Sequence, residues 1–140
     1  DEYIKKNPKQ QNALIVLDID HFKEVNDTYG HLSGNELLIS LAKYLLFYAN
    51  QDDIVIRMGG DEFVIFMKNI QNNLNYLCKE LMNHLDEITL SHHQLHFSMS
   101  MGVYAFNTPL NFDEAFKEAD NALYQSKRNG RSQFTIKYQS

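Results

Sequence analysis

Apolar and polar residues follow one another along this chain in blocks that predict strands and amphipathic helices in turn. Residues 13–18 form an apolar run that ends in acids, which is typical of a buried strand. From residue 33 or 34 to about residue 50, leucines recur every three or four positions and predict a helix. The apolar runs at 53–58 and 62–68 flank two glycines and predict a β-hairpin.

The second half of the chain continues this succession. A leucine stripe predicts a helix over about 71–90, and apolar residues alternating with serines predict a strand over 95–106. Asn111 is a typical N-cap for a third helix that stops near Gly130, and residues 132–138 suit a last strand. The order β-α-β-β-α-β-α-β predicts an α/β (α+β) sandwich, in which helices flank a mostly antiparallel sheet built around the hairpin.

Composition indicates a single globular domain. The chain has 140 residues, of which 44% are apolar, and this is enough for a hydrophobic core. A net charge of −5 argues against binding nucleic acid through a basic surface. The sequence shows no apolar run long enough to cross a bilayer and no signal peptide. We therefore expect a cytoplasmic domain that contacts neither nucleic acid nor membrane.

Acidic residues occur at two places where they suggest chemistry. Asp18 and Asp20 end the first apolar run, and because they are two apart we expect them on one side of the pleat. Asp61 and Glu62 follow the hairpin glycines, where missing Cβ atoms leave room for a phosphate. Four converging carboxylates suit divalent cations in phosphoryl or nucleotidyl transfer. The alternative is that these acids are ordinary solvated residues of a turn and a strand end.

Three blocks of the sequence resemble the GGDEF family of diguanylate cyclases. They are the run from Asp18 to Gly34, the hairpin Gly59-Gly60-Asp61-Glu62-Phe63, and the run from Ala119 to Arg131, in the family's order. The resemblance implies a palm-like β-α-β-β-α-β core similar to that of nucleotide cyclases. It also implies an enzyme that condenses two GTP molecules into cyclic di-GMP and releases pyrophosphate, with Mg²⁺ (or Mn²⁺) as cofactor.

The resemblance also implies roles for individual residues. Asp18, Asp61 and the carbonyl of Ile19 would ligate the metal, and Glu62 would act with Asp61 in catalysis. The nucleotide site would comprise His21, Phe22, Lys23, Asn26, Asn35, Gly59, Gly60, Lys127 and Arg131. Within this set, the residues from His21 to Lys23 would hold the β- and γ-phosphates together with Lys127 and Arg131, which lie four apart at the end of the third predicted helix.

Some of these residues also have simpler interpretations. Cations near a helix C-terminus are favoured there by the helix dipole, whatever the function of Lys127 and Arg131. Asn26 would hydrogen-bond guanine, but Asn26 and Asp27 are equally typical of a turn or a helix cap.

The chain departs from the family's pattern at three places. Residues 1–12 do not match the segment that usually precedes the first strand, so we expect residues 1–140 to be one GGDEF domain excised from a larger signalling protein. Asn50 replaces the arginine of an Arg-x-x-Asp product-inhibition motif that keeps its acid in Asp53. Asn35 replaces an aspartate that reads guanine, and its amide has only one acceptor group for guanine's two donors.

Two other functions stay open at this point. One is a catalytically weak GTP-binding regulatory GGDEF module, and the other is a cyclase with relaxed purine specificity because of Asn35. The expected partners are GTP as substrate, a second copy of the domain in a transient homodimer through the active-site face, and a covalently attached sensor or phosphodiesterase domain. The parent protein is either free in the cytoplasm or anchored to a membrane.

Overall fold

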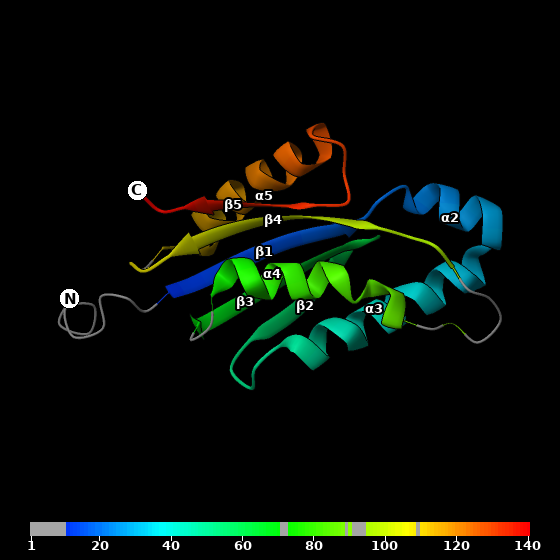
Figure 1. The fold of residues 1–140 in the computed structure, drawn as a ribbon, viewed down its shortest axis with the longest axis horizontal. Helices are drawn as coiled ribbons and strands as arrows, with labels where there is room; N and C mark the ends of the chain where they lie inside the picture. The colour runs from blue at the N-terminus through cyan, green and yellow to red at the C-terminus, as the bar shows by residue number, and fades with distance from the viewer. Residues whose placement is uncertain (1–10, 71–72, 89, 91–94, 109) are drawn as a thin grey trace.

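A five-stranded mixed sheet forms the centre of the computed structural model, which describes residues 11–70, 73–88, 90, 95–108 and 110–140 (Figure 1). The strands lie in the order β2-β3-β1-β4-β5. Their bounds are Gln11–Ile19 for β1, Ile54–Gly59 for β2, Glu62–Ile70 for β3, Met99–Phe106 for β4 and Phe134–Tyr138 for β5. The first four strands of this order pair antiparallel in turn, and β5 runs parallel to β4. The predicted sandwich on a mostly antiparallel sheet is therefore confirmed.

Helices cover both faces of the sheet. They are α2 (Phe22–Tyr29), α3 (His31–Tyr48), α4 (Leu74–Asn83), the short 3₁₀ helix η1 (Leu85–Glu87) and α5 (Phe112–Arg128). Figure 1 shows α3 and α4 on one side of the sheet and α5 on the other. Among the described residues, no helix combines the length and the apolar character needed to cross a bilayer.

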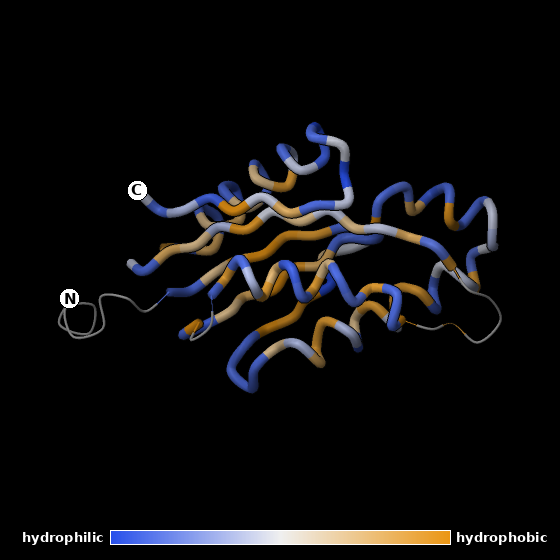
Figure 2. The backbone as a smooth tube through the Cα atoms, viewed as in Figure 1, coloured by the Kyte–Doolittle hydropathy of each residue, from blue (hydrophilic) through white to orange (hydrophobic). Residues whose placement is uncertain are grey.

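Successive side chains of β1 point to opposite faces of the sheet, and each face has its own hydrophobic core. Ile15 and Leu17 pack in the cluster formed with α3 and α4, whereas Leu14 and Val16 pack in the cluster under α5. All four side chains are fully buried, and Figure 2 shows the matching hydrophobic stretch along the strand. Coverage on both faces explains why the sequence of β1 is a continuous apolar run rather than an alternating one.

A glycine in β4 allows α5 to approach the sheet closely. A Cβ atom added to Gly102 would collide with the backbone of Ala119 and Leu123 in α5. Ser126 near the end of the same helix donates a hydrogen bond of 2.7 Å to the carbonyl of Met101 in β4. The C-terminal part of α5 is therefore fixed against the strand next to β1, which matters for the site described below.

Several predicted boundaries are wrong. The helix predicted from residue 33 or 34 begins at His31 and is preceded by α2, which the pattern did not predict. The helix predicted over 71–90 ends at Asn83 and is followed by η1, while residues 71, 72 and 89 of that range lie outside the described part. The strand predicted from residue 95 begins at Met99.

Candidate functional site

Three of the predicted acids meet where β1 ends beside the β2–β3 hairpin. Asp18 lies directly opposite Glu62 in the antiparallel register of β1 and β3. The chain turns through Gly60 and Asp61, between the end of β2 and the start of β3. Gly59 has a φ of 138° and Gly60 a φ of 53°, so both adopt left-handed backbone conformations that side-chain-bearing residues disfavour. The two glycines thus make the tight turn that carries Asp61 and Glu62 to Asp18.

Asp18 has one paired and one unpaired carboxylate oxygen. Lys127 of α5 places its Nζ 2.6 Å from Asp18 Oδ2. Asp18 Oδ1 is buried and has no hydrogen-bond partner among the described residues. A buried acceptor without a partner costs free energy, and a cation bound at Oδ1 would remove that cost. This oxygen is the clearest sign that the edge of the sheet is built to receive a charged group.

The pKa values of these acids reflect a crowding of negative charge. Burial raises the pKa of Asp18; the hydrogen bond and charge of Lys127 oppose this, and the charges of Asp61 and Asp20 add to it. Burial also raises the pKa of Glu62, helped by the charges of Asp120, Asp18 and Asp61 and opposed by Lys127. Carboxyl groups in such a place favour a nearby cation, because it offsets the cost of burying their negative charge.

Asp120 belongs to this electrostatic cluster, although the sequence did not single it out. It lies on α5, two helical turns before Lys127, and is the acid with the largest effect on Glu62. Asp120 could have been predicted from its spacing, because it lies seven residues before Lys127 and therefore on the same side of the helix.

Asp20 lies close enough to Asp18 for its charge to raise the pKa of that residue, but its own carboxylate is occupied by hydrogen bonds to other residues. β1 ends at Ile19, and the alternation of side chains does not extend to Asp20. Its carboxylate accepts hydrogen bonds of 2.6 Å from the hydroxyls of Ser98 and Ser100 and one of 3.0 Å from the N–H of Ser132. Asp20 therefore ties the end of β1 to β4 and to the segment after α5.

The carboxylate oxygens of Asp18 and Asp61 suit a hard cation such as Mg²⁺ only if phosphate and water oxygens complete its coordination. In the part of the chain that the structure describes, no group of three or more His, Cys, Asp or Glu side chains is arranged to hold a metal ion. Mg²⁺ is commonly held by one or two carboxylates together with substrate phosphates and water. The unpaired oxygen of Asp18, with Asp61 beside it, fits that mode of binding.

α2 begins shortly after β1, and its first turn contains the residues predicted to bind phosphate. His21 is the N-cap, with a φ of 55°, and its side chain makes no capping hydrogen bond with any described residue. Phe22 and Lys23 form the first turn that follows. Backbone N–H groups and the positive end of the helix dipole make such a terminus suitable for phosphate.

Arg131 reaches the same end of the sheet by a route other than the predicted one. α5 ends at Arg128, so Arg131 lies beyond the helix and not in its last turn with Lys127. Gly130 has a φ of 115° and Arg131 a φ of 64°, which turns the chain back after the helix. The N–H of Arg131 donates to the carbonyl of Ser126 at 3.0 Å. The next residue is the one bonded to Asp20, so the turn lies beside the end of β1.

A hollow lies between the first half of α3 and the hairpin. Its volume is about 440 Å³, and it is lined by Asn35, Leu38, Ile39, Ala42, Arg57 and Phe63. Two polar side chains, those of Asn35 and Arg57, face apolar walls, which is the usual construction of a site for a planar ring. The sequence analysis named Asn35 but not Arg57. Arg57 lies two residues after Val55 of β2, which packs against the core, so alternation along the strand could have placed both side chains on the same face.

Asn26 lies in the interior of α2 and not in a turn or at a cap, so that simpler interpretation is wrong. A Cβ atom on Gly34 would collide with Asn26 Oδ1, so the glycine makes room for this amide against α3. Asn26 Oδ1 is buried and lacks a hydrogen-bond partner in the described ranges. The residue does not line the hollow that holds Asn35 and Arg57, although its unpaired acceptor is suited to a ligand donor.

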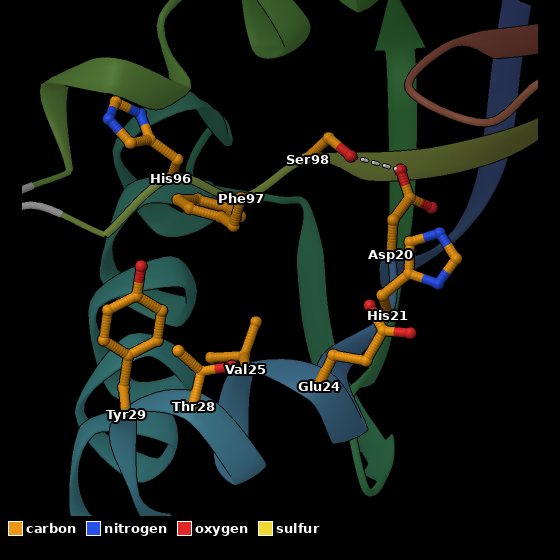
Figure 3. Close-up of a pocket in the computed structure, with 9 residues that line it drawn as sticks. All are labelled: Asp20, His21, Glu24, Val25, Thr28, Tyr29, His96, Phe97 and Ser98. Carbon is orange, nitrogen blue, oxygen red and sulfur yellow. Dashed lines mark hydrogen bonds between the residues drawn. The ribbon is translucent and has the colours of Figure 1, made fainter.

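The other side of α2 borders a second hollow of about 440 Å³, drawn in Figure 3. Its lining comes from α2 with the two residues before it and from the segment that leads into β4, namely Asp20, His21, Glu24, Val25, Thr28, Tyr29, His96, Phe97 and Ser98. Figure 3 shows the hydrogen bond from Ser98 to Asp20 at its edge.

The chain is similar to characterised proteins over almost its whole length. A family model described as "Diguanylate cyclase, GGDEF domain" matches residues 2–133. Diguanylate cyclase A of Treponema denticola is 32% identical over 132 residues, which cover 91% of this chain and 36% of that protein. The chain spans about a third of the length of the curated relatives it matches.

Solved structures give the same result. The active GGEEF domain of a diguanylate cyclase from Vibrio cholerae superposes with a TM-score of 0.81 at 30% identity, covering 99% of this chain and 90% of that one. The GGDEF domain of DgcB from Caulobacter crescentus, in complex with c-di-GMP, gives a TM-score of 0.78 at 26% identity and covers 96% of this chain and 82% of that one.

Proposed function

Because this chain belongs to the GGDEF family of diguanylate cyclase domains, we propose that it condenses two GTP molecules into cyclic di-GMP and releases pyrophosphate. The observation that carries the proposal is the buried, unpaired oxygen of Asp18, which lies opposite Glu62 and beside Lys127. A carboxylate of this kind needs a cation, and the N-terminus of α2 next to it suits the phosphates that accompany one.

The proposed cofactor is Mg²⁺ (or Mn²⁺), held by Asp18, Asp61 and the carbonyl of Ile19. When bound, such an ion neutralises charge on the phosphates and stabilises the charge that develops during transfer. The ammonium of Lys127 pairs with Asp18 at 2.6 Å. Release of Lys127 from Asp18 would leave this cation available for the phosphates of the substrate.

The chain's own residues would then divide the remaining work. The backbone at His21 and Phe22, with the side chains of Lys23, Lys127 and Arg131, would hold the β- and γ-phosphates. Gly59 and Gly60 would let the substrate approach the hairpin. Glu62, whose pKa is raised, would accept the proton of the attacking 3′-hydroxyl. The oxygen of that hydroxyl would then bond to the α-phosphorus of the other GTP, and pyrophosphate would leave.

The base would occupy the hollow beside α3, against Asn35, with Asn26 contributing its unpaired acceptor nearby. A regulatory module without catalysis is not favoured, because Asp18, Asp61 and Glu62 are all present and several of the matched relatives are named as diguanylate cyclases. Since those relatives are about three times as long, a covalently attached sensor or phosphodiesterase domain remains part of the proposal, as does a cytoplasmic site of action.

The test is a product assay with purified protein. Protein, Mg²⁺ and an equimolar mixture of GTP and ATP are incubated, and the products are separated by chromatography and identified by mass. We expect cyclic di-GMP and pyrophosphate, and no product when Mg²⁺ is chelated. Recovery of unreacted GTP at high protein concentration, with GTP binding intact, would instead support the regulatory module. Adenine-containing cyclic dinucleotides would support relaxed purine specificity.

A further inference from the structure

We infer that Arg57 is the residue that selects guanine over adenine at this site, an assignment that rests on the proposed function. The amide of Asn35 lines the hollow in which the proposed function places the base. Asn35 carries both a donor and an acceptor, so by itself it discriminates poorly between the two purines. Arg57 is the charged residue in the lining of the same hollow.

The guanidinium of Arg57 is fixed in place by the hairpin itself. Its Nε and Nη2 donate to the carbonyl of Gly60 at 2.9 and 2.7 Å. This carbonyl is available because Gly59 and Gly60 take left-handed conformations at the turn. A side chain held by two hydrogen bonds loses less rotamer freedom when a ligand binds, so it is a more selective contact than a free arginine.

The part of the guanidinium that Gly60 does not use still carries donors. Arginine has five N–H groups, and the bonds to Gly60 involve one on Nε and one on Nη2. The N–H groups on Nη1 and the second one on Nη2 form a fork at the end of the side chain. Such a fork matches two adjacent acceptors in one plane.

Guanine presents such a pair of acceptors, and adenine does not. Guanine carries O6 beside N7, whereas adenine carries a donor amine beside N7, so an arginine fork pairs with guanine and opposes adenine. The walls of the hollow, Leu38, Ile39, Ala42 and Phe63, offer apolar surface to the ring. Guanine would then place O6 and N7 on Arg57 and direct a donor of its other edge toward the carbonyl of Asn35.

The test is a binding cycle that combines protein and ligand changes. Wild-type protein, Arg57→Gln and Arg57→Lys are titrated by calorimetry with Mg²⁺ and three triphosphates that lack the attacking hydroxyl: 3′-deoxy-GTP, 3′-deoxy-7-deaza-GTP and 3′-deoxy-ATP. The 7-deaza analogue keeps every group of guanine except the N7 acceptor. Arg128→Gln is the matched control, because it makes the same chemical change on α5, where Arg128 lies over the ring of Tyr124.

Wild-type protein should bind 3′-deoxy-GTP about tenfold or more tightly than 3′-deoxy-ATP, and several-fold more tightly than the 7-deaza analogue. Arg57→Gln should bring both ratios close to one, Arg57→Lys should keep part of the preference because its ammonium still donates but lacks the planar fork, and Arg128→Gln should leave both ratios unchanged. If Arg57 only supports the hairpin, its variants will lower the affinity for all three triphosphates by the same factor, and the inference is wrong. If wild-type protein binds none of the three, the proposed function itself fails, and the inference fails with it.

Discussion

Asp18 and Asp61 illustrate how one site can hold charges that do not contribute to the stability of the fold. Asp18 keeps an unpaired buried oxygen, and Asp61 adds negative charge to it from the exposed tip of a hairpin. Nothing in this pairing favours folding, because like charges repel and burial penalises them. Lys127 offsets part of this cost at Asp18, and a cation bound between the two acids would offset more of it, in agreement with the proposed role of both residues.

Replacing Asp61 by Ala should therefore lower turnover by about 10²-fold or more, since loss of a metal ligand removes several kcal/mol of transition-state stabilisation. Initial rates of cyclic di-GMP formation at saturating GTP and Mg²⁺ measure the effect. Asp52→Ala, which removes an exposed acid in the turn before β2, should keep the wild-type rate. A near-wild-type rate for Asp61→Ala would remove this residue from the catalytic set.

Glu62 should show a conflict between stability and activity. Its pKa in the folded state is raised by burial and then by Asp120 and Asp18, so its ionisation destabilises the folded protein as pH rises through that value. Without Mg²⁺, Glu62→Gln should raise Tm at about pH 7.5, and the gain should vanish at about pH 4, where Glu62 is protonated in both states. The same variant should lose activity. Thermal unfolding at both pH values tests this, and a lower Tm at neutral pH would contradict it.

Single positions also show what the sequence could not predict. The proximity of the acids at 18, 61 and 62 was predicted from residue type and position, because they end a strand and follow the glycines of a hairpin. The hydrogen bonds of Asp20 and the position of Arg131 beyond α5 were not predicted, because each depends on where a strand or helix ends. Asp20 is bonded to residues 98, 100 and 132, which are distant in sequence, and no local pattern encodes such contacts.

Among the helices and strands, periodicity predicted those that bury a continuous stripe. α5 and α3 carry such stripes, and both were found within three residues of their ends. α2 has only Val25 buried among its eight residues, so it gave no periodic signal. Its polar residues instead resemble a turn, and its existence depends on packing against α3 rather than on helix propensity.

The junction of α4 and η1 contains a histidine held between two carboxylates. His84 Nε2 lies 2.8 Å from Glu80, and its Nδ1 lies 2.7 Å from Glu87. Partial desolvation lowers the pKa of His84, but the hydrogen bonds and charges of Glu87 and Glu80 together outweigh it, so the net pKa is raised. The prediction of one helix over 71–90 did not include the end of α4 at Asn83, because the apolar stripe continues through Leu85 and Ile88.

A raised histidine pKa predicts a pH-dependent contribution to stability. The contribution is fully present below the unfolded value of about 6.5 and is lost as pH rises through the higher folded value. His84→Gln should therefore lower Tm at about pH 6 and change it little at about pH 9. Thermal unfolding of both proteins across this range measures the difference, with His31→Gln, an exposed histidine of α3, as control. A difference that does not vary with pH would show that the ion pairs are not responsible.

For the molecule as a whole, the turn between α3 and β2 bears on feedback by product. Both oxygens of Asp53 are bonded to backbone, Oδ2 to the N–H of Asn50 at 2.8 Å and Oδ1 to the N–H of Lys68 at 3.0 Å. Asn50 also lacks the guanidinium that would grip a guanine or a phosphate. Cyclic di-GMP should therefore inhibit the enzyme weakly, as judged by rates measured with added product. Inhibition at low micromolar product that Asp53→Ala abolishes would contradict this.

Assembly follows from the number of bonds in the product. Among the described residues, the acids at the end of β1 and the hollow beside α3 would hold one GTP under the proposed function, whereas cyclic di-GMP contains two new phosphodiester bonds. Each 3′-hydroxyl must attack the α-phosphate held by the other domain, so two copies must meet through the faces that carry Asp18 and Glu62. If the isolated domain dimerises weakly, the initial rate should rise more steeply than in proportion to protein concentration. Rates measured from nanomolar to micromolar protein, with light scattering at each concentration, test the dependence. A strictly proportional rate from a species that scatters as a monomer throughout would rule out the homodimer.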